Sequence, residues 1–102
     1  MIKILLCCSA GMSTSLLVNK MLSYTGMNGI DCIVEAVPVS EAKQMLSEWD
    51  VILVGPQVTY ALTELKQMTK KPVAVIPPQI YATAKGKETV ELAVKLYNDS
   101  KL

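Results

Sequence analysis

The sequence predicts a small α/β domain in which a parallel sheet is covered by helices on both faces. Short apolar runs alternate along the chain with amphipathic segments of helical period. The runs are nearly continuous rather than alternating, which is typical of strands buried on both faces. The chain has 102 residues, 51% of them hydrophobic, which suffices for one compact core but not for two. We therefore expect residues 1–102 to form a single doubly wound domain.

The first half of the chain begins with a strand, a helix and a second strand. Residues 2–7 are an apolar run that predicts a buried strand. Apolar residues recur at helical spacing over 13–24, with Ser13 as the N-cap and Gly26 as the stop. Residues 31–37 predict the second strand.

The second half of the chain repeats this alternation. Ser40 is expected to cap a short amphipathic helix, and 51–54 predicts a third strand. The pattern is helical over 57–68, and a fourth strand is expected over 72–76. The last helix is predicted over 86–98, so the chain supplies four strands with helices between them.

The order of these strands determines where a site can form. Crossovers between parallel strands are right-handed, and a flavodoxin-like order 2-1-3-4 reverses the winding between strands 1 and 3. A crevice then opens at the carboxyl ends of these two strands. The loop that begins at Cys8 and the turn at 55–57 border this crevice, so topology alone nominates both segments.

Composition excludes several kinds of protein. Ten basic and nine acidic residues give a net charge of +1, which provides no field to attract nucleic acid. The apolar N-terminal run is too short for a membrane span or a signal peptide, so we expect a cytoplasmic protein without membrane insertion. Three cysteines do not indicate a disulfide framework. No histidine is present, so a Cys–His pair and most zinc sites are excluded, and we expect no metal and no cofactor.

The segment after the first strand has the composition of a phosphate-binding loop. A glycine-containing turn that leads into a helix offers backbone N–H groups and the positive end of the helix dipole to an anion. Serine and threonine hydroxyls add side-chain donors. The residues of this predicted loop are Ser9, Ala10, Gly11, Met12, Ser13, Thr14 and Ser15.

Cys8 stands where the first strand meets this loop. The donors that would hold a phosphate would also stabilise a thiolate, so a nucleophile can be activated without histidine. We expect Cys8 to be a solvent-facing thiolate that accepts a phosphoryl group. Cys7 and Cys32 lie inside apolar runs and are expected to be inert core residues. A disulfide between Cys7 and Cys8 is disfavoured because neighbours on a strand point to opposite faces.

A second loop follows the third strand. Gly55 and Pro56 form an ordinary strand-ending turn, but their place at the crevice favours a further role for this segment. Gln57 can offer its amide to a phosphoryl group or to a partner. Tyr60 lies one helical turn further on and is a weaker candidate, because the pattern also puts it on an apolar stripe with Met68.

The run Cys-Ser-Ala-Gly-Met-Ser-Thr-Ser-Leu-Leu-Val at 8–18, together with Gly-Pro-Gln at 55–57, resembles the IIB component of the lactose/cellobiose class of the bacterial sugar phosphotransferase system. The resemblance extends over the chain in length and element order. It implies that Cys8 takes a phosphoryl group from a phosphohistidine of the IIA protein and donates it to a sugar bound by the membrane-embedded IIC permease. Cellobiose, chitobiose, lactose and related β-glucosides all remain open, and we expect a monomer.

Other interpretations of the same loop are weaker. Low-molecular-weight tyrosine phosphatases and arsenate reductases share the strand, cysteine, loop and helix, but their loop is Cys-x5-Arg, and Thr14 stands in the place of that arginine. Without a guanidinium fork, bidentate clamping of a phosphoryl transition state is lost. A response-regulator receiver needs an aspartate after a central strand, whereas Asp50 precedes one. A redox thiol needs a resolving cysteine within reach, whereas the other two cysteines, Cys7 and Cys32, lie inside predicted strands.

Overall fold

The computed structural model describes residues 1–9 and 15–101, which form a four-stranded parallel sheet flanked by helices. The strands are β1 (Ile2–Cys8), β2 (Cys32–Pro38), β3 (Val51–Val54) and β4 (Val73–Val75). Their order is β2-β1-β3-β4, which confirms the predicted topology and places the winding reversal between β1 and β3. All four strands are parallel, so their carboxyl ends share one edge of the sheet.

The two central strands are the most deeply buried part of the fold. In β1, the residues from Ile4 to Cys8 are all buried, and so is every residue of β3. Leu5 of β1 lies between Glu35 of β2 and Ile52 of β3 in the register. A parallel strand covered on both faces needs apolar side chains in both directions, which explains the continuous apolar runs in the sequence.

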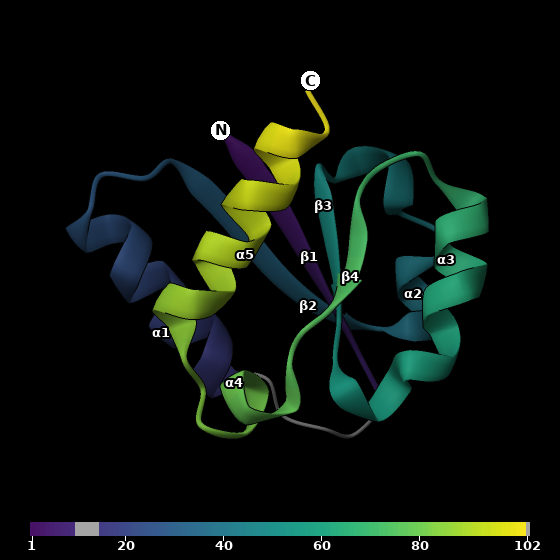
Figure 1. Ribbon diagram of the computed structural model, residues 1–102, viewed down its shortest axis with the longest axis horizontal. Coiled ribbons are helices and arrows are strands. Elements are labelled where there is room, and N and C mark those ends of the chain that lie inside the picture. The colour runs from purple at the N-terminus through teal and green to yellow at the C-terminus, as the bar shows by residue number, and fades with distance from the viewer. Residues whose placement is uncertain (10–14, 102) are drawn as a thin grey trace.

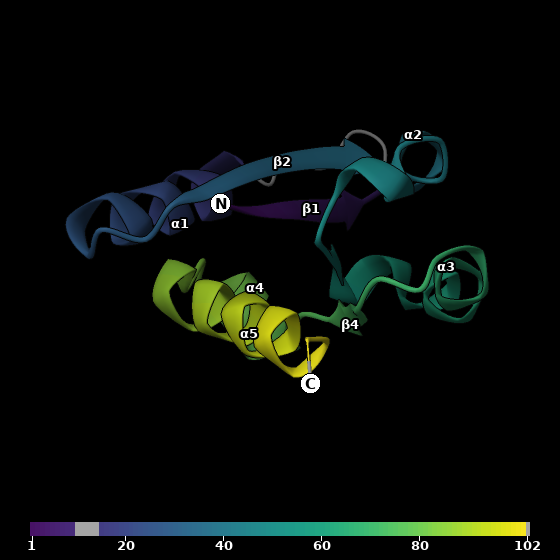
Figure 2. The same cartoon turned by 90° about the horizontal axis from the view of Figure 1, so that it is seen from above.

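The helices form two layers, one on each face of the sheet (Figures 1 and 2). One layer contains α1 (Ser15–Met27), α5 (Gly86–Asp99) and the short α4 (Pro78–Ala82). The other contains α2 (Val39–Ala42) and α3 (Leu62–Met68). The predicted covering of both faces is therefore confirmed.

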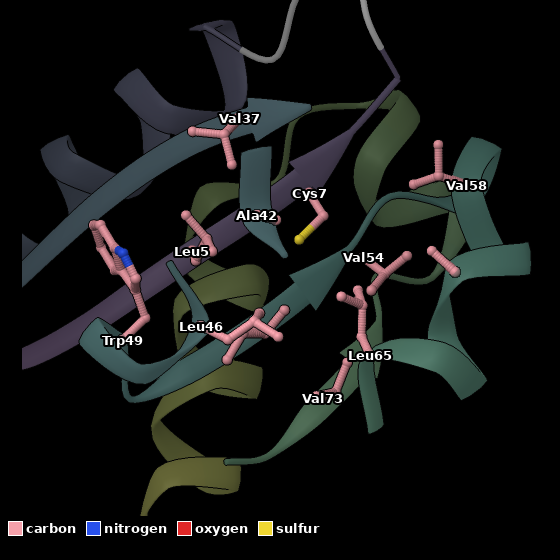
Figure 3. Packing of buried hydrophobic residues seen from close by; sticks show 12 residues of the cluster. Leu5, Cys7, Val37, Ala42, Leu46, Trp49, Val54, Val58, Leu65 and Val73 are labelled. Carbon is pink, nitrogen blue, oxygen red and sulfur yellow. The ribbon is translucent and has the colours of Figure 1, made fainter. Parts of the chain in front are cut away.

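Alternate residues of β1 enter the two cores. Ile4 and Leu6 belong to the core beneath α1 and α5. Leu5 and Cys7 belong to the core beneath α2 and α3, and Figure 3 shows the Cys7 side chain within that cluster. By the same alternation, Cys8 lies on the face covered by α1, α4 and α5.

The end of α1 differs from the prediction. The helix continues through Gly26 to Met27, and Gly29 ends it in a left-handed conformation with φ +65°. The backbone N–H of Ile30 donates to the carbonyl of Thr25, which is the 6→1 bond of a Schellman motif. Gly29 rather than Gly26 is therefore the stop, and the predicted cap Ser13 lies outside the described residues.

Two middle segments are also less regular than predicted. Ser40 does not cap its helix but lies inside the four-residue α2, and a separate 3₁₀ turn, η1 (Leu46–Glu48), follows. The predicted helix over 57–68 is divided into a 3₁₀ segment, η2 (Pro56–Ala61), and α3. Helical period alone does not distinguish one long helix from two short pieces of different winding.

The layer of α1 and α5 depends on a close backbone contact at Gly86. A Cβ atom at this position would lie 2.3 Å from the carbonyl carbon of Lys20, 2.5 Å from its oxygen and 2.6 Å from the backbone nitrogen of Met21. All three atoms belong to the backbone of α1 and cannot move as a side chain would. The first turn of α5 therefore rests directly on α1, which only glycine permits.

We expect Gly86→Ala to lower the free energy of unfolding by about 1–3 kcal/mol, because the added methyl group forces the two helices apart. The matched control is Gly26→Ala, since a Cβ at Gly26 meets no atom within 4 Å. That substitution should stabilise α1 by about 0.5–1 kcal/mol. Urea unfolding of both variants measures the difference, and a Gly86→Ala protein as stable as wild type contradicts the contact.

Candidate functional site

Cys8 is the last residue of β1 and lies at the edge of the sheet where the winding reverses. The strand is one residue longer than predicted, so Cys8 is still paired with Pro38 of β2. Its thiol donates a hydrogen bond to the carbonyl oxygen of Val37, with a sulfur-to-oxygen distance of 3.4 Å. Only 7% of the residue is exposed, so the expectation of a solvent-facing side chain is wrong.

The bond between Cys8 and Val37 has a chemical consequence. A carbonyl oxygen accepts a proton and offers none, so the bond exists only while the sulfur is a thiol. The sulfur must leave this partner when it ionises or forms a bond to phosphorus. A nucleophilic Cys8 therefore needs hydrogen-bond donors, and these must come from elsewhere than the Val37 carbonyl of β2.

Only the two ends of the predicted phosphate-binding loop belong to the described part of the chain. Ser9 follows β1 and is half-buried, and Ser15 is the first residue of α1. The strand end and the helix start are thus placed as the prediction requires. The predicted loop residues between them lie outside the described residues: Ala10, Gly11, Met12, Ser13 and Thr14.

The second predicted loop lies beside the end of β1. The N–H of Gly55 donates to the carbonyl of Cys7 at 2.9 Å, which extends the pairing of β1 and β3 by one residue. Pro56 starts η2, and Gln57 is exposed. A Cβ on Gly55 would lie 3.2 Å from the Gln57 side-chain oxygen and 3.6 Å from Cε2 of Tyr81, so both side chains use the space that this glycine leaves.

Tyr60 is exposed over 76% of its surface. It therefore does not lie on the buried apolar stripe on which the sequence pattern places both Tyr60 and Met68. The backbone is non-helical at Val58, and this kink turns Val58 and Ala61 inward instead. Tyr60 is also absent from the cavity described next. Its predicted place on an apolar stripe is therefore wrong.

A cavity of about 580 Å³ opens at the carboxyl edge of the sheet, between α1, η2 and α4. Leu16 and Leu17 form one wall and Gln57 another. Most of the remaining wall comes from α4, a helix that the sequence pattern does not predict. A signal was present, because Pro77-Pro78 follows a strand and proline favours the first helical turn. The lining residues are Leu16, Leu17, Pro56, Gln57, Pro78, Tyr81, Ala82 and Ala84.

The other two cysteines occupy environments that disfavour reaction. Cys7 is 1% exposed, and burial, together with the nearby charge of Cys8, raises the pKa of its thiol to about 12. Cys32 is half-buried at the start of β2, and burial followed by the charge of Asp31 raises its pKa. A protonated thiol is a poor nucleophile. Position on the strand thus places Cys7 and Cys8 in different surroundings.

The site lacks the groups that hydrolytic enzymes use. All ten basic residues of the sequence are lysine, so no arginine fork is available anywhere in the chain. Asp31 and Asp50 precede β2 and β3, at the edge opposite to Cys8. Within residues 1–9 and 15–101, no three acidic, cysteine or histidine side chains are grouped closely enough to bind a metal ion. In the same residues, no helix is long and apolar enough to cross a bilayer.

Comparison with known proteins decides the family. Residues 3–92 match the family described as the lactose/cellobiose-specific IIB subunit of the sugar phosphotransferase system. The chain belongs to this family. An oligo-β-mannoside-specific EIIB component of Bacillus subtilis is 40% identical over 92% of this chain and 94% of its own length. A galactose-specific EIIB component of Lactococcus lactis is 36% identical over 93% of this chain and 95% of its own length.

Solved structures support the same IIB assignment. The cellobiose-specific IIB component of Borrelia burgdorferi superposes with a TM-score of 0.83 at 31% identity, over 97% of this chain and 94% of that one. A lactose-specific IIB domain of Streptococcus pneumoniae gives a TM-score of 0.84 over 94% of this chain and 97% of that one. Its identity is 15%, so this second similarity concerns the fold alone.

The raised pKa of Cys7 predicts a loss of stability at alkaline pH. The unfolded thiol ionises near 9.0 and the folded one near 12, so the contribution is complete below about pH 9 and is lost as the pH rises toward 12. Between about pH 8 and about pH 10.5, wild type should lose about 2 kcal/mol more than Cys7→Ala in urea unfolding. Parallel pH curves for the two proteins contradict this prediction.

Proposed function

We propose that this IIB protein is a cytoplasmic phosphocarrier in which Cys8 accepts a phosphoryl group from a phosphohistidine of IIA and passes it to a sugar bound by IIC. The supporting observation is the position of Cys8 at the carboxyl end of β1, where the sheet reverses its winding beside a cavity. Ligands of such sheets bind at this edge. Membership of the IIB family supports phosphoryl transfer as the class of reaction.

The proposed relay consists of two displacements at phosphorus. In the first, the Cys8 thiolate attacks the phosphoryl group, a sulfur–phosphorus bond forms, and the bond from phosphorus to the histidine nitrogen breaks with its electron pair on nitrogen. In the second, a sugar hydroxyl oxygen attacks phosphorus, loses its proton, and the sulfur leaves as a thiolate. Neither step needs a redox partner. The protein must position the group and neutralise its oxygens.

Among the described residues, no lysine lines the cavity, so backbone donors are proposed to supply this neutralisation. The loop between Ser9 and Ser15 would direct N–H groups at the phosphoryl oxygens, and α1, which starts at Ser15, would add the positive end of its dipole. Gln57 contributes a side-chain amide to another wall of the cavity. Such a site holds a dianion without hydrolysing it.

The partners and the sugar follow from the same role. IIA and IIC would use the face around Cys8 in turn, which is compatible with a monomer of residues 1–102. The relatives are named for oligo-β-mannosides, galactose and cellobiose. We propose a sugar of the cellobiose, chitobiose, lactose or β-glucoside class, with its specificity residing in the permease.

Labelling tests the relay directly. With labelled phosphoenolpyruvate, the upstream phosphocarriers and IIA, the wild-type protein should take up the label, and Cys8→Ser should fall to background because a hydroxyl is a far weaker nucleophile than a thiolate. The controls are Cys32→Ser and Cys7→Ala, which should retain labelling. Label in the Cys8→Ser protein equal to wild type would refute the assignment of Cys8.

A second prediction separates a relay from a phosphatase. The chain has no arginine, and its aspartates do not reach the cysteine edge, so neither an arginine clamp nor an aspartate general acid is available. The purified protein should therefore hydrolyse p-nitrophenyl phosphate no faster than Cys8→Ser does. Rapid hydrolysis by wild type that is lost in Cys8→Ser contradicts the relay.

A further inference from the structure

One buried hydroxyl at the edge of the Cys8 site makes no hydrogen bond to the residues that the structure describes. The Tyr81 oxygen is shielded from solvent, yet it makes no hydrogen bond within the described part of the chain. Leaving a buried hydroxyl without a partner destabilises a fold, so such groups are rare in native proteins. A phenylalanine would fill the same space without this cost. The hydroxyl therefore calls for an explanation beyond packing.

The position of Tyr81 is fixed by the short helix that carries it. Pro78 starts α4, and the N–H groups of Ile80 and Tyr81 both donate to the carbonyl of Pro77. At the other end, Ala84 adopts a left-handed conformation with φ 51°, and the N–H of Lys85 donates to the carbonyl of Ile80. Backbone hydrogen bonds thus define both ends of α4. The C-terminal end requires a left-handed conformation at Ala84, which alanine disfavours.

The ring of Tyr81 approaches the sheet where Cys8 ends. Its Cε2 atom lies 3.6 Å from the position that a Cβ atom on Gly55 would take. The N–H of Gly55 in turn donates a hydrogen bond to the carbonyl of Cys7. Tyr81 packs against the core that contains Ile4 and Leu6, the face on which Cys8 also lies. In Figure 1, α4 lies at the carboxyl edge of the sheet beside the first turn of α1. The ring also lines the cavity described above.

Electrostatics agree with this placement. Burial, followed by the charge of an ionised Cys8, raises the pKa of the Tyr81 phenol. The hydroxyl thus keeps its proton at neutral pH, even beside a negative sulfur. It can donate a hydrogen bond without becoming a second anion.

We propose that the Tyr81 hydroxyl donates a hydrogen bond to the phosphoryl group carried by Cys8 and so stabilises the phosphorylated form of the protein. This inference rests on the proposed function. It assigns a neutral donor to a site in a chain that has neither arginine nor histidine. Hydrogen bonds to charged acceptors are stronger than those between neutral groups.

The test measures the equilibrium of phosphoryl exchange between phosphorylated IIA and this protein. Tyr81→Phe keeps the ring and removes only the donor, so the equilibrium constant should shift about tenfold or more toward phospho-IIA. The thermal midpoint of the unphosphorylated variant should be unchanged or higher, since an unpartnered hydroxyl has been removed. A role in packing alone predicts no shift in the exchange equilibrium.

The control variant is Tyr97→Phe, which removes a hydroxyl from α5 at the far end of the molecule, where Tyr97 stacks with Lys101. Its exchange equilibrium should equal that of wild type. If wild type itself takes no phosphoryl group, the proposed function fails and this inference fails with it. If wild type is phosphorylated and Tyr81→Phe matches it, the inference alone is overturned.

Discussion

The hydrogen bond from Gly55 to the carbonyl of Cys7 holds the carboxyl edge of the sheet together. It prolongs the pairing of the two central strands to the point where both chains turn away into loops. The same residue lacks a side chain, so the Tyr81 ring and the Gln57 amide both approach the strand end. The cavity and Cys8 are therefore arranged around one backbone contact between β1 and β3.

A second constraint is the alternation of side chains along β1. Cys7 and Cys8 are adjacent in sequence, but the strand sends them into different layers of the protein. Cys7 meets the apolar core beneath α2 and α3 and keeps its proton. Cys8 meets the edge where β2, α1 and α4 converge. Two adjacent thiols thus lie in different layers of the protein.

The sequence predicted the parts of this structure that depend on long apolar runs. All four strands, their order and the outer helices α1 and α5 follow from burial on both faces, a signal that several residues carry together. Single-residue signals were less reliable. The pattern predicts a helix stop at Gly26, but of the two glycines Gly26 and Gly29 it is Gly29 that adopts the left-handed conformation of a stop. A glycine's identity does not reveal its φ angle.

The candidate site was predictable to a similar degree. Cys8 and the 55–57 turn follow from topology, whereas the burial of the Cys8 side chain depends on one more residue of strand pairing. Tyr60 was misplaced because a kink at Val58 redirects the helix face. Tyr81 was missed because α4 is only five residues long, too short for periodicity to show. Its approach to Gly55, at the end of β3, is a long-range contact that no local pattern contains.

The contact at Gly86 also bears on the mechanics of the cavity. Leu16 and Leu17 of α1 form one wall, and Ala84, two residues before Gly86, belongs to another. Because the backbones of α1 and α5 are in contact at Gly86, this contact fixes the spacing of the two walls. In the proposed relay, a partner or phosphoryl group would enter a recess that is already formed, so little conformational entropy would be lost on binding. Affinity for successive partners would then be set by surface fit, which suits the proposed role of a carrier that must release each of them.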